Sequence, residues 1–284
     1  MRRRCHVTIG KYTVKNYDGL PGVNFSILKH INTSPKMFVH SLSARRKPSP
    51  AMSLGSAIHA IVLEPESFQD AFAVYTDGIR RGKEWDAFKA SQEGKTILSG
   101  AEIDHVMKVA NSVRGDSLAR GFLKDIEPEM TFQWVDRGTG IECKGRVDGI
   151  SADGSTIVGL KTTRATTMRQ FSNEIVNFLY HAQWAYYHDA YVETYGKTPT
   201  MVEIVVCTQE PHDVVCYEVP GNVLAKGRAL YQGWLATLKT CRETERWPGL
   251  SDGMLVPVEL PLWALDADDD DDDAGEVVIE GESF

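Results

Sequence analysis

The amino-acid sequence predicts an α/β fold that is built as one domain. Two early segments, 57–72 and 99–115, carry apolar residues at helical spacing. Between Pro128 and Thr163 the pattern changes to short strand-like runs that are separated by turn residues. A long helix over about 168–195, two more strands and a final helix follow, so helices and strands alternate as they do in α/β proteins.

Local signals support each element in turn. Prolines and serines indicate a loop over 45–56, before the first of these helices. The helix at 99–115 has Ser99 as its cap, Glu102 three positions later and Gly115 at its far end. Strands are expected at 129–136, 140–151, 155–163, 198–209 and 213–220, and further helices at 84–94 and 222–243.

Composition narrows the class of protein. Hydrophobic residues make up 42% of the 284-residue chain and charged residues 25%, which is ordinary for a globular protein in water. No apolar run approaches the roughly 20 residues that cross a bilayer, and the basic start, MRRRCHVTIG, lacks the apolar stretch of a secretory signal. The five cysteines are scattered without a CxxC pair, so we expect free thiols in the cytoplasm and neither a zinc site nor an iron–sulfur cluster.

The net charge of −8 originates at the end of the chain. Residues 266–284 contain ten acids and no basic residue, so the remainder has 31 basic and 29 acidic residues, a balance of +2. A body near neutrality is compatible with a nucleic-acid substrate, because a basic groove can be local. The block of like charges predicts a disordered acidic tail over 266–284 that follows a single domain over 1–265.

A hairpin is predicted where residues 145–163 read GRVDGISADGSTIVGLKTT. The pair Asp153–Gly154 favours a two-residue type I′ turn, which needs a positive φ at both positions. With this turn Asp148 lies opposite Gly159, and Lys161 lies two residues further along on the same face. A side chain at 159 would have its Cβ roughly 4.5–5.5 Å from that of Asp148, a distance at which two acids can share a divalent cation.

An aspartate, a second acid and a lysine in this arrangement suit phosphodiester hydrolysis. Carboxylates can hold one or two Mg²⁺ ions, which activate water and neutralise charge at the transition state. A lysine beside them can orient or deprotonate the water. The spacing alone also arises by chance in hairpins, so the interpretation needs further residues to support it.

Several segments together resemble a known family. RVDGI and TIVGLKTT, followed by YHAQWAYYHDAY on a helix, are similar to the PD-(D/E)xK nuclease superfamily, and most closely to the RecE (exonuclease VIII) type of phage recombination exonuclease. The segments NYDGLPGVNFSILKHINTSPKMF, LGSAIHAIVLEPESF, GKTILSGAE and WPGL with VELPLWA match the same family in order, so the resemblance covers roughly residues 17–265. It implies a restriction-endonuclease-like α/β core with a mixed central sheet flanked by helices.

The resemblance also implies roles for individual residues. Asp148 matches the first metal-binding aspartate, and His59 and Glu129 match residues that approach the metal. Lys161 matches the catalytic lysine, and a QxxxY element that supports the lysine and the phosphate consists of Gln183 and Tyr187. A spacing of four places this last pair on one face of its helix.

Gly159 departs from the family pattern, which has an acid two residues before the lysine. Three explanations remain open: a substitution in an otherwise active enzyme, an acid that has moved to another part of the chain, or a nuclease that has lost its function. We favour the first, because the other matching residues are present, and we expect severe impairment. Glu142 would lie about 20 Å along the strand, too far to replace the acid, whereas Glu174 starts the long helix and could swing inward.

For the whole protein the resemblance implies a Mg²⁺-dependent (or Mn²⁺-dependent) exonuclease that degrades one strand of linear double-stranded DNA from its 5′ end and leaves a 3′ overhang. It also implies a ring-like homo-oligomer, a single-strand annealing protein as partner in phage recombination, and a cytoplasmic location without membrane contact. One alternative is a non-catalytic DNA-binding or assembly protein that keeps the fold. Another is a RecB-like nuclease on single strands, whose iron–sulfur version the missing cysteines disfavour.

Overall fold

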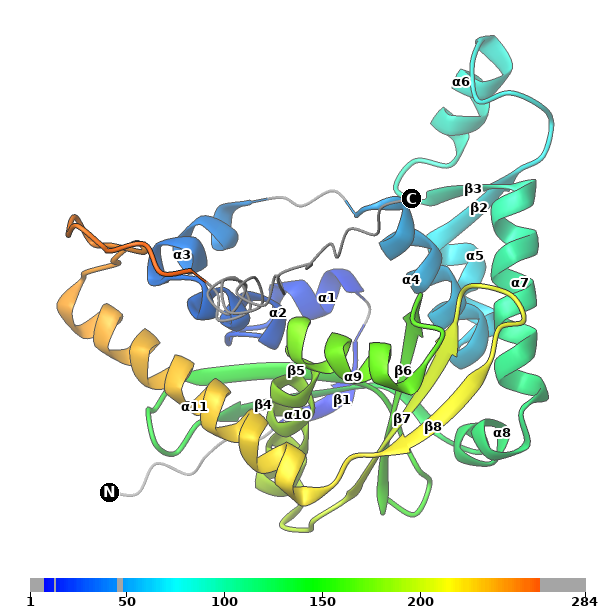
Figure 1. Cartoon of the computed structure of the whole chain (residues 1–284). Coiled ribbons are helices and arrows are strands. Elements are labelled where there is room, and N and C mark those ends of the chain that lie inside the picture. The colour runs from blue at the N-terminus through cyan, green and yellow to red at the C-terminus, as the bar shows by residue number, and fades with distance from the viewer. Residues whose placement is uncertain (1–7, 13, 45–47, 261–284) are drawn as a thin grey trace, which may run out of the picture.

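A mixed six-stranded sheet forms the centre of the computed structural model, which describes residues 8–12, 14–44 and 48–260 (Figure 1). The strand order is β1-β4-β5-β6-β7-β8; β6 and β7 pair in parallel and the other neighbours in this sheet pair antiparallel. The strands are β1 (Thr8–Lys11), β4 (Glu127–Val135), β5 (Glu142–Ile150), β6 (Thr156–Thr163), β7 (Thr200–Cys207) and β8 (Val214–Glu218). The predicted α/β class with a mixed central sheet is therefore confirmed.

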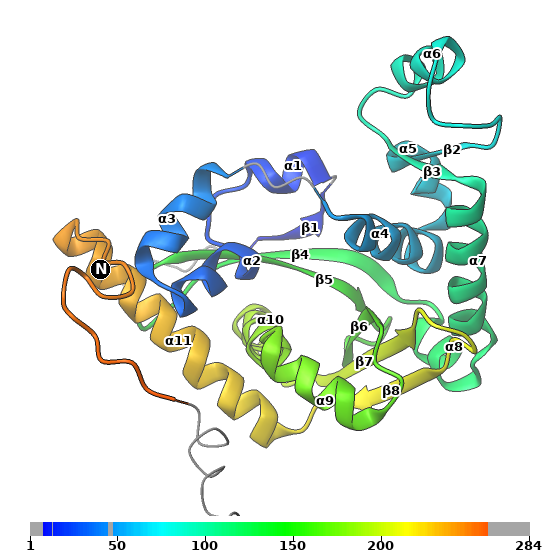
Figure 2. The same ribbon diagram turned by 45° about the horizontal axis from the view of Figure 1, so that its top comes forward.

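Helices cover both faces of this sheet (Figures 1 and 2). One apolar core joins the sheet to α10 (Tyr180–Tyr195) and α11 (Gly221–Thr244), and it contains Trp184 and Leu235. A second core joins the opposite face to α4 (Pro50–Leu63) and α7 (Gly100–Gly115). The remaining helices are α1 (Val14–Gly19), α2 (Phe25–Leu28), η1 (Lys29–Asn32), α3 (Pro35–Ser43), η2 (Pro65–Ser67), α5 (Phe68–Ala71), α6 (Lys83–Ser91), α8 (Ser117–Leu123) and α9 (Met168–Asn177).

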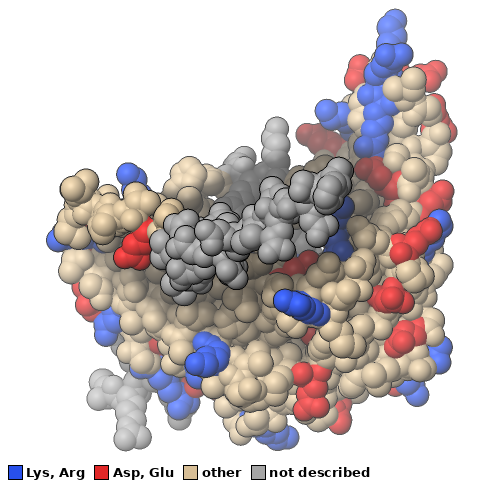
Figure 3. Space-filling view, viewed as in Figure 1, with Lys and Arg blue, Asp and Glu red and all other residues tan. Residues whose placement is uncertain are grey.

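A small second sheet lies beside α7. It consists of the parallel strands β2 (Phe72–Tyr75) and β3 (Thr96–Ser99). The chain between these strands carries α6, which projects away from the main body in the ribbon views (Figure 1 and Figure 2) and in the space-filling view (Figure 3). At the end of β3, Ser99 and Glu102 form the predicted capping box of α7.

The β5–β6 hairpin has the predicted register but a different turn. Gly149 pairs with Val158, and Ser151 donates its backbone N–H to Thr156, which is the register that puts residue 148 opposite residue 159. Gly154 has a φ of 68°, whereas Asp153 does not have the positive φ of a type I′ turn. The Asp153 carboxylate instead accepts hydrogen bonds from residues on both sides of it, so the turn is longer than the two-residue loop predicted.

Three predicted boundaries were wrong. The expected helix over 57–72 ends at Leu63 and is followed by η2, α5 and the start of β2. The expected loop over 45–56 is helical from Pro50, because Ser49 caps α4 with its side chain and proline suits the first helical position. The expected long helix over 168–195 is two helices, α9 and α10, which are separated at Phe178 and Leu179. Leu179 has a φ of 62°, a left-handed conformation that an α-helix cannot contain.

Other predictions concern features that the described residues cover only in part. The four cysteines at 143, 207, 216 and 241 are free, as predicted, and Cys5 lies outside the described residues. The predicted acidic tail over 266–284 also lies outside them. Among the described helices, none has both the length and the apolar character needed to cross a bilayer.

Candidate functional site

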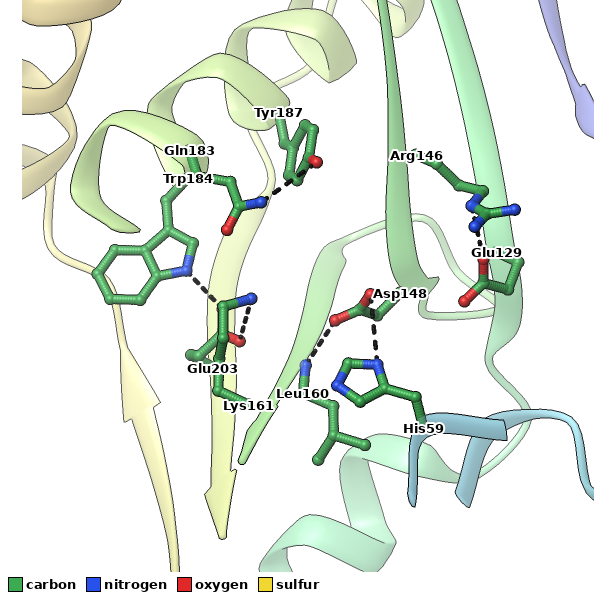
Figure 4. Close-up of polar contacts among 10 residues, drawn as sticks. All are labelled: His59, Glu129, Arg146, Asp148, Leu160, Lys161, Gln183, Trp184, Tyr187 and Glu203. Carbon is green, nitrogen blue, oxygen red and sulfur yellow. Dashed lines mark hydrogen bonds and ion pairs between the residues drawn. The ribbon is translucent and has the colours of Figure 1, made fainter. Parts of the chain in front are cut away.

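Polar side chains from β5, β6, β7 and α10 surround one small pocket (Figure 4). The pocket has a volume of about 50 Å³. Its polar and glycine lining consists of Arg146, Asp148, Gly159, Lys161, Gln183, Trp184, Tyr187 and Glu203. Four of the six predicted site residues are therefore brought together, although they come from segments separated by up to 39 positions.

Strand alternation explains which side chains point into the pocket. Ile157 of β6 and Met201 of β7 belong to the core under α10. Side chains two residues further along a strand lie on the same face, so Gly159, Lys161 and Glu203 follow on that face. Lys161 and the carboxylates are thus held between the sheet and α10.

Asp148 is fixed by two contacts at the point where β5 and β6 separate. The backbone pairing between these strands ends at Gly149 and Val158. Beyond that pair, the Asp148 Oδ2 accepts a 2.8 Å hydrogen bond from the backbone N–H of Leu160. Its Oδ1 lies 3.9 Å from Nδ1 of His59 on α4. The carboxylate therefore faces the pocket from the strand opening.

His59 is a neutral imidazole at neutral pH. Burial lowers its pKa from the ordinary value, and the nearby Lys161 ammonium lowers it further, while Asp148 opposes both effects. At 3.9 Å from the aspartate, His59 is close enough to influence the carboxylate electrostatically but too far for a hydrogen bond.

Lys161 is a protonated ammonium between two acids. Burial opposes its charge, yet the carboxylates of Glu203 and Asp148 outweigh this effect and raise its pKa above the ordinary value. The Nζ lies 3.3 Å from the Glu203 Oε1 and 5.4 Å from the centre of the Tyr180 ring, a cation–π contact. At neutral pH this lysine acts as a cation rather than as a base.

Glu203 is a charged residue of the pocket that the sequence prediction missed. It lies on β7 beside Gly159 of β6, and its side chain is 1% exposed. The indole N–H of Trp184 donates a hydrogen bond to Oε2. Burial raises the pKa of Glu203, and the Lys161 ammonium opposes that rise. The signal in the sequence is a single acid within the apolar strand TMVEIVVC, since a charge in a buried strand needs a partner.

Gln183 and Tyr187 share one face of α10, as their spacing predicts. The Gln183 Nε2 lies 3.4 Å from the Tyr187 hydroxyl, a long hydrogen bond. The Tyr187 ring lies so close over Gly145 that a Cβ there would be 2.9 Å from the ring. Both side chains line the pocket, and their catalytic role stays a prediction.

Glu129 forms an ion pair at the edge of this group. Its Oε2 lies 2.7 Å from Nε of Arg146, and Figure 4 shows the two side chains on the far side of Asp148 from Lys161. Burial raises the pKa of Glu129 to about 7, with Arg146 opposing the rise and Asp148 adding to it. The predicted metal role of Glu129 stays a prediction, because its carboxylate is already paired with an arginine.

The two acids considered as replacements at Gly159 are not placed for that role. Glu142 is exposed at the far end of β5. Glu174 on α9 accepts a 2.7 Å hydrogen bond from the Thr163 hydroxyl instead of turning into the pocket. Glu203 is the acid in contact with Lys161.

The pocket offers two carboxylates to a divalent cation. Hard cations such as Mg²⁺ bind carboxylate and carbonyl oxygens. The Glu203 Oε1 is buried without a hydrogen bond and has only the Lys161 ammonium beside it in the ionic contacts of the described residues. Over the same part of the chain, no three His, Cys, Asp or Glu side chains surround a common point as a complete ligand set. The donor set thus suits a cation that keeps several waters and binds through one or two carboxylates.

Comparison with known protein families identifies the family to which this chain belongs. The model of a family described as a PDDEXK-like domain of unknown function (DUF3799) matches residues 24–254. The chain belongs to this PDDEXK-like family. Asp148 and Lys161 lie within the matched region, so a nuclease-like domain contains both of the residues on which the sequence interpretation depended.

A solved structure has the same overall fold as this chain. The crystal structure of a "Putative exonuclease" from Eubacterium rectale is similar to this chain with a TM-score of 0.57 and 13% sequence identity. The similarity covers 91% of this chain and 99% of the other. At this identity the likeness shows the shared fold alone. No curated protein matches the sequence.

Proposed function

We propose that this chain is a Mg²⁺-dependent exodeoxyribonuclease that degrades one strand of linear double-stranded DNA from its 5′ end. The observation that carries the proposal is the convergence of Asp148, Lys161 and Glu203 in one pocket of a PDDEXK-like domain. Of these three groups Glu203 is fully buried, while Lys161 and Asp148 are partly buried, and such a cluster of charges is costly to a fold and contributes little to stability. Such a group is therefore better explained by chemistry than by packing.

The residues of the chain would divide the work of hydrolysis as follows. A bound Mg²⁺ would supply charge neutralisation at the phosphate and activation of the attacking water. Asp148 would hold the ion, and its contact with the backbone N–H of Leu160 keeps its carboxylate aimed at the pocket. Lys161 would orient the water and stabilise the developing negative charge, because it keeps its proton at Nζ.

Gln183 and Tyr187 would support the lysine and the phosphate from α10. Their amide and hydroxyl groups line the same pocket wall and contact each other. Neither group carries a charge at neutral pH, since burial raises the pKa of Tyr187 further above its ordinary value. Both are therefore suited to donating hydrogen bonds to an anionic substrate.

The finer parts of the proposal rest on the sequence resemblance to RecE-type exonucleases. They are the 5′ to 3′ polarity, the 3′ overhang, the ring-like homo-oligomer and the single-strand annealing protein as partner in phage recombination. The similarity to a protein described as an exonuclease is in keeping with an enzyme that acts on DNA ends.

The direct test is digestion of linear duplex DNA labelled at either the 5′ or the 3′ end. We expect Mg²⁺-dependent release of the 5′ label first, no digestion of closed circular duplex, and no activity with EDTA. Asp148→Asn is the matched control, because asparagine can still accept the Leu160 hydrogen bond but lacks the charge. Digestion that Asp148→Asn does not reduce by at least about 100-fold contradicts the proposal.

A non-catalytic DNA-binding protein is the second candidate. It is favoured by the lack of a complete ligand set among the described residues and by the position of the Lys161 ammonium, which already neutralises the carboxylates. Binding of linear duplex that is equal in wild type and Asp148→Asn, without cleavage by either protein, supports this candidate instead.

A further inference from the structure

We infer that Glu203 is the second metal-binding acid of this site, that it has moved from β6 to β7, and that Gly159 is the residue that makes room for it. This inference rests on the proposed function and names a residue of the same site. It replaces the expectation that the glycine leaves the site without its second acid.

The register of the sheet brings residue 203 next to residue 159. β6 and β7 are parallel, and Gly159 is the direct neighbour of Glu203 in that pairing. Neighbouring strands are about 4.8 Å apart, and paired side chains point to the same face. A carboxylate that leaves Cα 203 can therefore reach the position of a carboxylate that leaves Cα 159.

The Glu203 carboxylate occupies the space beside Gly159. A Cβ built on residue 159 would lie 2.4 Å from Oε2 of Glu203 and 2.7 Å from both Cδ and Oε1. These distances are far below van der Waals contact, and every one of them is to the carboxylate itself. The carboxylate of Glu203 fills the volume of the missing side chain, so an acid at 159 and the present position of Glu203 exclude each other.

The polar contacts of Glu203 differ between its two carboxylate oxygens. Trp184 donates to Oε2 and thereby fixes the orientation of the carboxylate. The other oxygen, Oε1, is buried and makes no hydrogen bond within the described residues, although Lys161 Nζ lies 3.3 Å away. A buried acceptor left open costs free energy, and an oxygen that faces the pocket in this way is available to a cation.

The alternative to a metal-binding role is that Glu203 only neutralises the charge of Lys161. That explanation accounts for the ion pair between Oε1 and Lys161 but not for the position of the carboxylate in the volume of a side chain at 159. The two explanations differ in what happens to metal binding when the charge of Glu203 is removed, which can be measured without DNA.

The first experiment measures Mn²⁺ binding by the full chain, with isothermal titration calorimetry and the Mn²⁺ electron paramagnetic resonance signal as the two readouts. We expect Glu203→Gln to weaken binding by at least about 10-fold, since one of two carboxylates is lost. Glu174→Gln is the matched control and should bind Mn²⁺ as the wild type does, because Glu174 is held by Thr163. Unchanged Mn²⁺ affinity in Glu203→Gln overturns the inference, as does a wild type that binds no Mn²⁺.

The second measurement is a swap of the acid between strands. Gly159→Asp alone should lower the melting temperature and should not improve Mn²⁺ binding, because the new side chain meets the Glu203 carboxylate. The double variant Gly159→Asp/Glu203→Ala should bind Mn²⁺ at least about 10-fold more tightly than Glu203→Ala. Gly159→Ala/Glu203→Ala is the control for the added Cβ and should show no such recovery. If Gly159→Asp alone strengthens Mn²⁺ binding, the site was lacking an acid and the inference is wrong.

These outcomes separate the inference from the proposed nuclease activity. Loss of Mn²⁺ binding in Glu203→Gln, in a protein that cleaves no DNA, supports the relocated acid and contradicts the proposed function. Cleavage by the wild type, together with unchanged Mn²⁺ binding in Glu203→Gln, supports the proposed function and contradicts the relocated acid.

Discussion

Glu203 on β7 lies beside Gly159 on β6, and its carboxylate occupies the volume that a side chain at residue 159 would need. The absence of an acid at residue 159 is therefore accompanied by a carboxylate from the neighbouring strand in the same volume. This carboxylate lies 3.3 Å from Lys161 and has Trp184 as its other partner.

Lys161→Met tests whether the lysine acts as a cation. The methionine side chain has similar length but no charge, so we expect cleavage to fall by about 10²- to 10³-fold, the usual loss when one group that stabilises charge in the transition state is removed. The two acids would then repel each other in a buried site, and the variant should melt at a lower temperature than the wild type. Mn²⁺ should raise the melting temperature of the variant more than that of the wild type, because the ion would replace the missing charge.

Differential scanning fluorimetry with and without Mn²⁺ measures this effect, and a duplex digestion assay measures the rate. Lys108→Met is the control, since Lys108 is an exposed residue on α7 that pairs with Glu210 away from the pocket. Equal Mn²⁺-induced shifts in the wild type and Lys161→Met would show that the ammonium and the cation do not share the same acids.

Gly227→Ala tests how closely α10 and α11 must pack to hold the site. A Cβ at 227 would lie 1.9 Å from the backbone oxygen of His181 on α10, so the helices must separate. We expect the free energy of unfolding to fall by about 2–3 kcal/mol and cleavage to fall as well, since α10 carries Gln183 and Tyr187. Urea unfolding and the digestion assay measure the two effects.

Gly233→Ala is the matched control on the same helix. No atom lies within 4 Å of a Cβ at 233, and its backbone is helical. Alanine is the better helix former, so this variant should be more stable by up to about 1 kcal/mol and fully active. Similar losses in both variants would mean that α11 tolerates no alanine for reasons other than the contact with α10.

The fold class and the hairpin register were predictable from sequence because both follow from local periodicity. The pairing of Gly149 with Val158 requires only the position of the turn, and the DG pair marked it even though the turn type differed. The partner of Gly159 was not predictable, because β7 lies about 40 residues further along the chain and its parallel pairing depends on the whole α9–α10 crossover.

The break at Leu179 was missed for a related reason. The segment 168–195 has helical composition throughout, and no glycine or proline marks the interruption. Leu179 has a left-handed conformation, and its side chain packs against the apolar core that contains Trp184 and Leu235. Local propensity cannot predict such a break, because tertiary packing can override it. The break separates α9 from α10, which carries Gln183 and Tyr187.

Asp189→Asn tests the contribution of the ion pair and hydrogen bonds that join Asp189 on α10 to Arg228 and Tyr231 on α11. Burial would raise the pKa of Asp189, but hydrogen bonds from Arg228, His188 and Tyr231 lower it to about 2. Because the folded pKa lies below the ordinary value of 3.8, the charge stabilises the fold above about pH 4, and this stabilisation is lost as the pH falls toward 2.

We expect Asp189→Asn to lower the free energy of unfolding by about 1–2 kcal/mol at pH 7, after allowance for solvent screening. The difference from the wild type should shrink between pH 4 and pH 2.5. Urea unfolding at a series of pH values measures it. A difference that stays constant down to pH 2.5 would assign the effect to lost hydrogen bonds rather than to the charge.

His59 is the predicted site residue whose role the contacts define least, and two variants distinguish its possible actions. Its Nδ1 lies 3.9 Å from Asp148, and burial keeps the imidazole neutral, so it can bind a cation through nitrogen or orient the aspartate. Either action predicts that His59→Ala weakens Mn²⁺ binding by about 10-fold or more. His40→Ala, on an exposed part of α3, is the control and should leave the affinity unchanged.

His59→Asn then identifies the atom involved. The asparagine amide stands close to where Nδ1 was, so it can still orient Asp148, but it is a far poorer metal ligand than imidazole. Affinity that His59→Asn restores to the wild-type level therefore assigns His59 to orienting Asp148, whereas affinity as low as in His59→Ala assigns it to the metal. Because the pKa of His59 is lowered, the imidazole is neutral throughout pH 7–8.5, and we expect the same ranking of variants across that range. Mn²⁺ titrations at both ends of the range check this, and wild-type affinity in His59→Ala would remove His59 from the site.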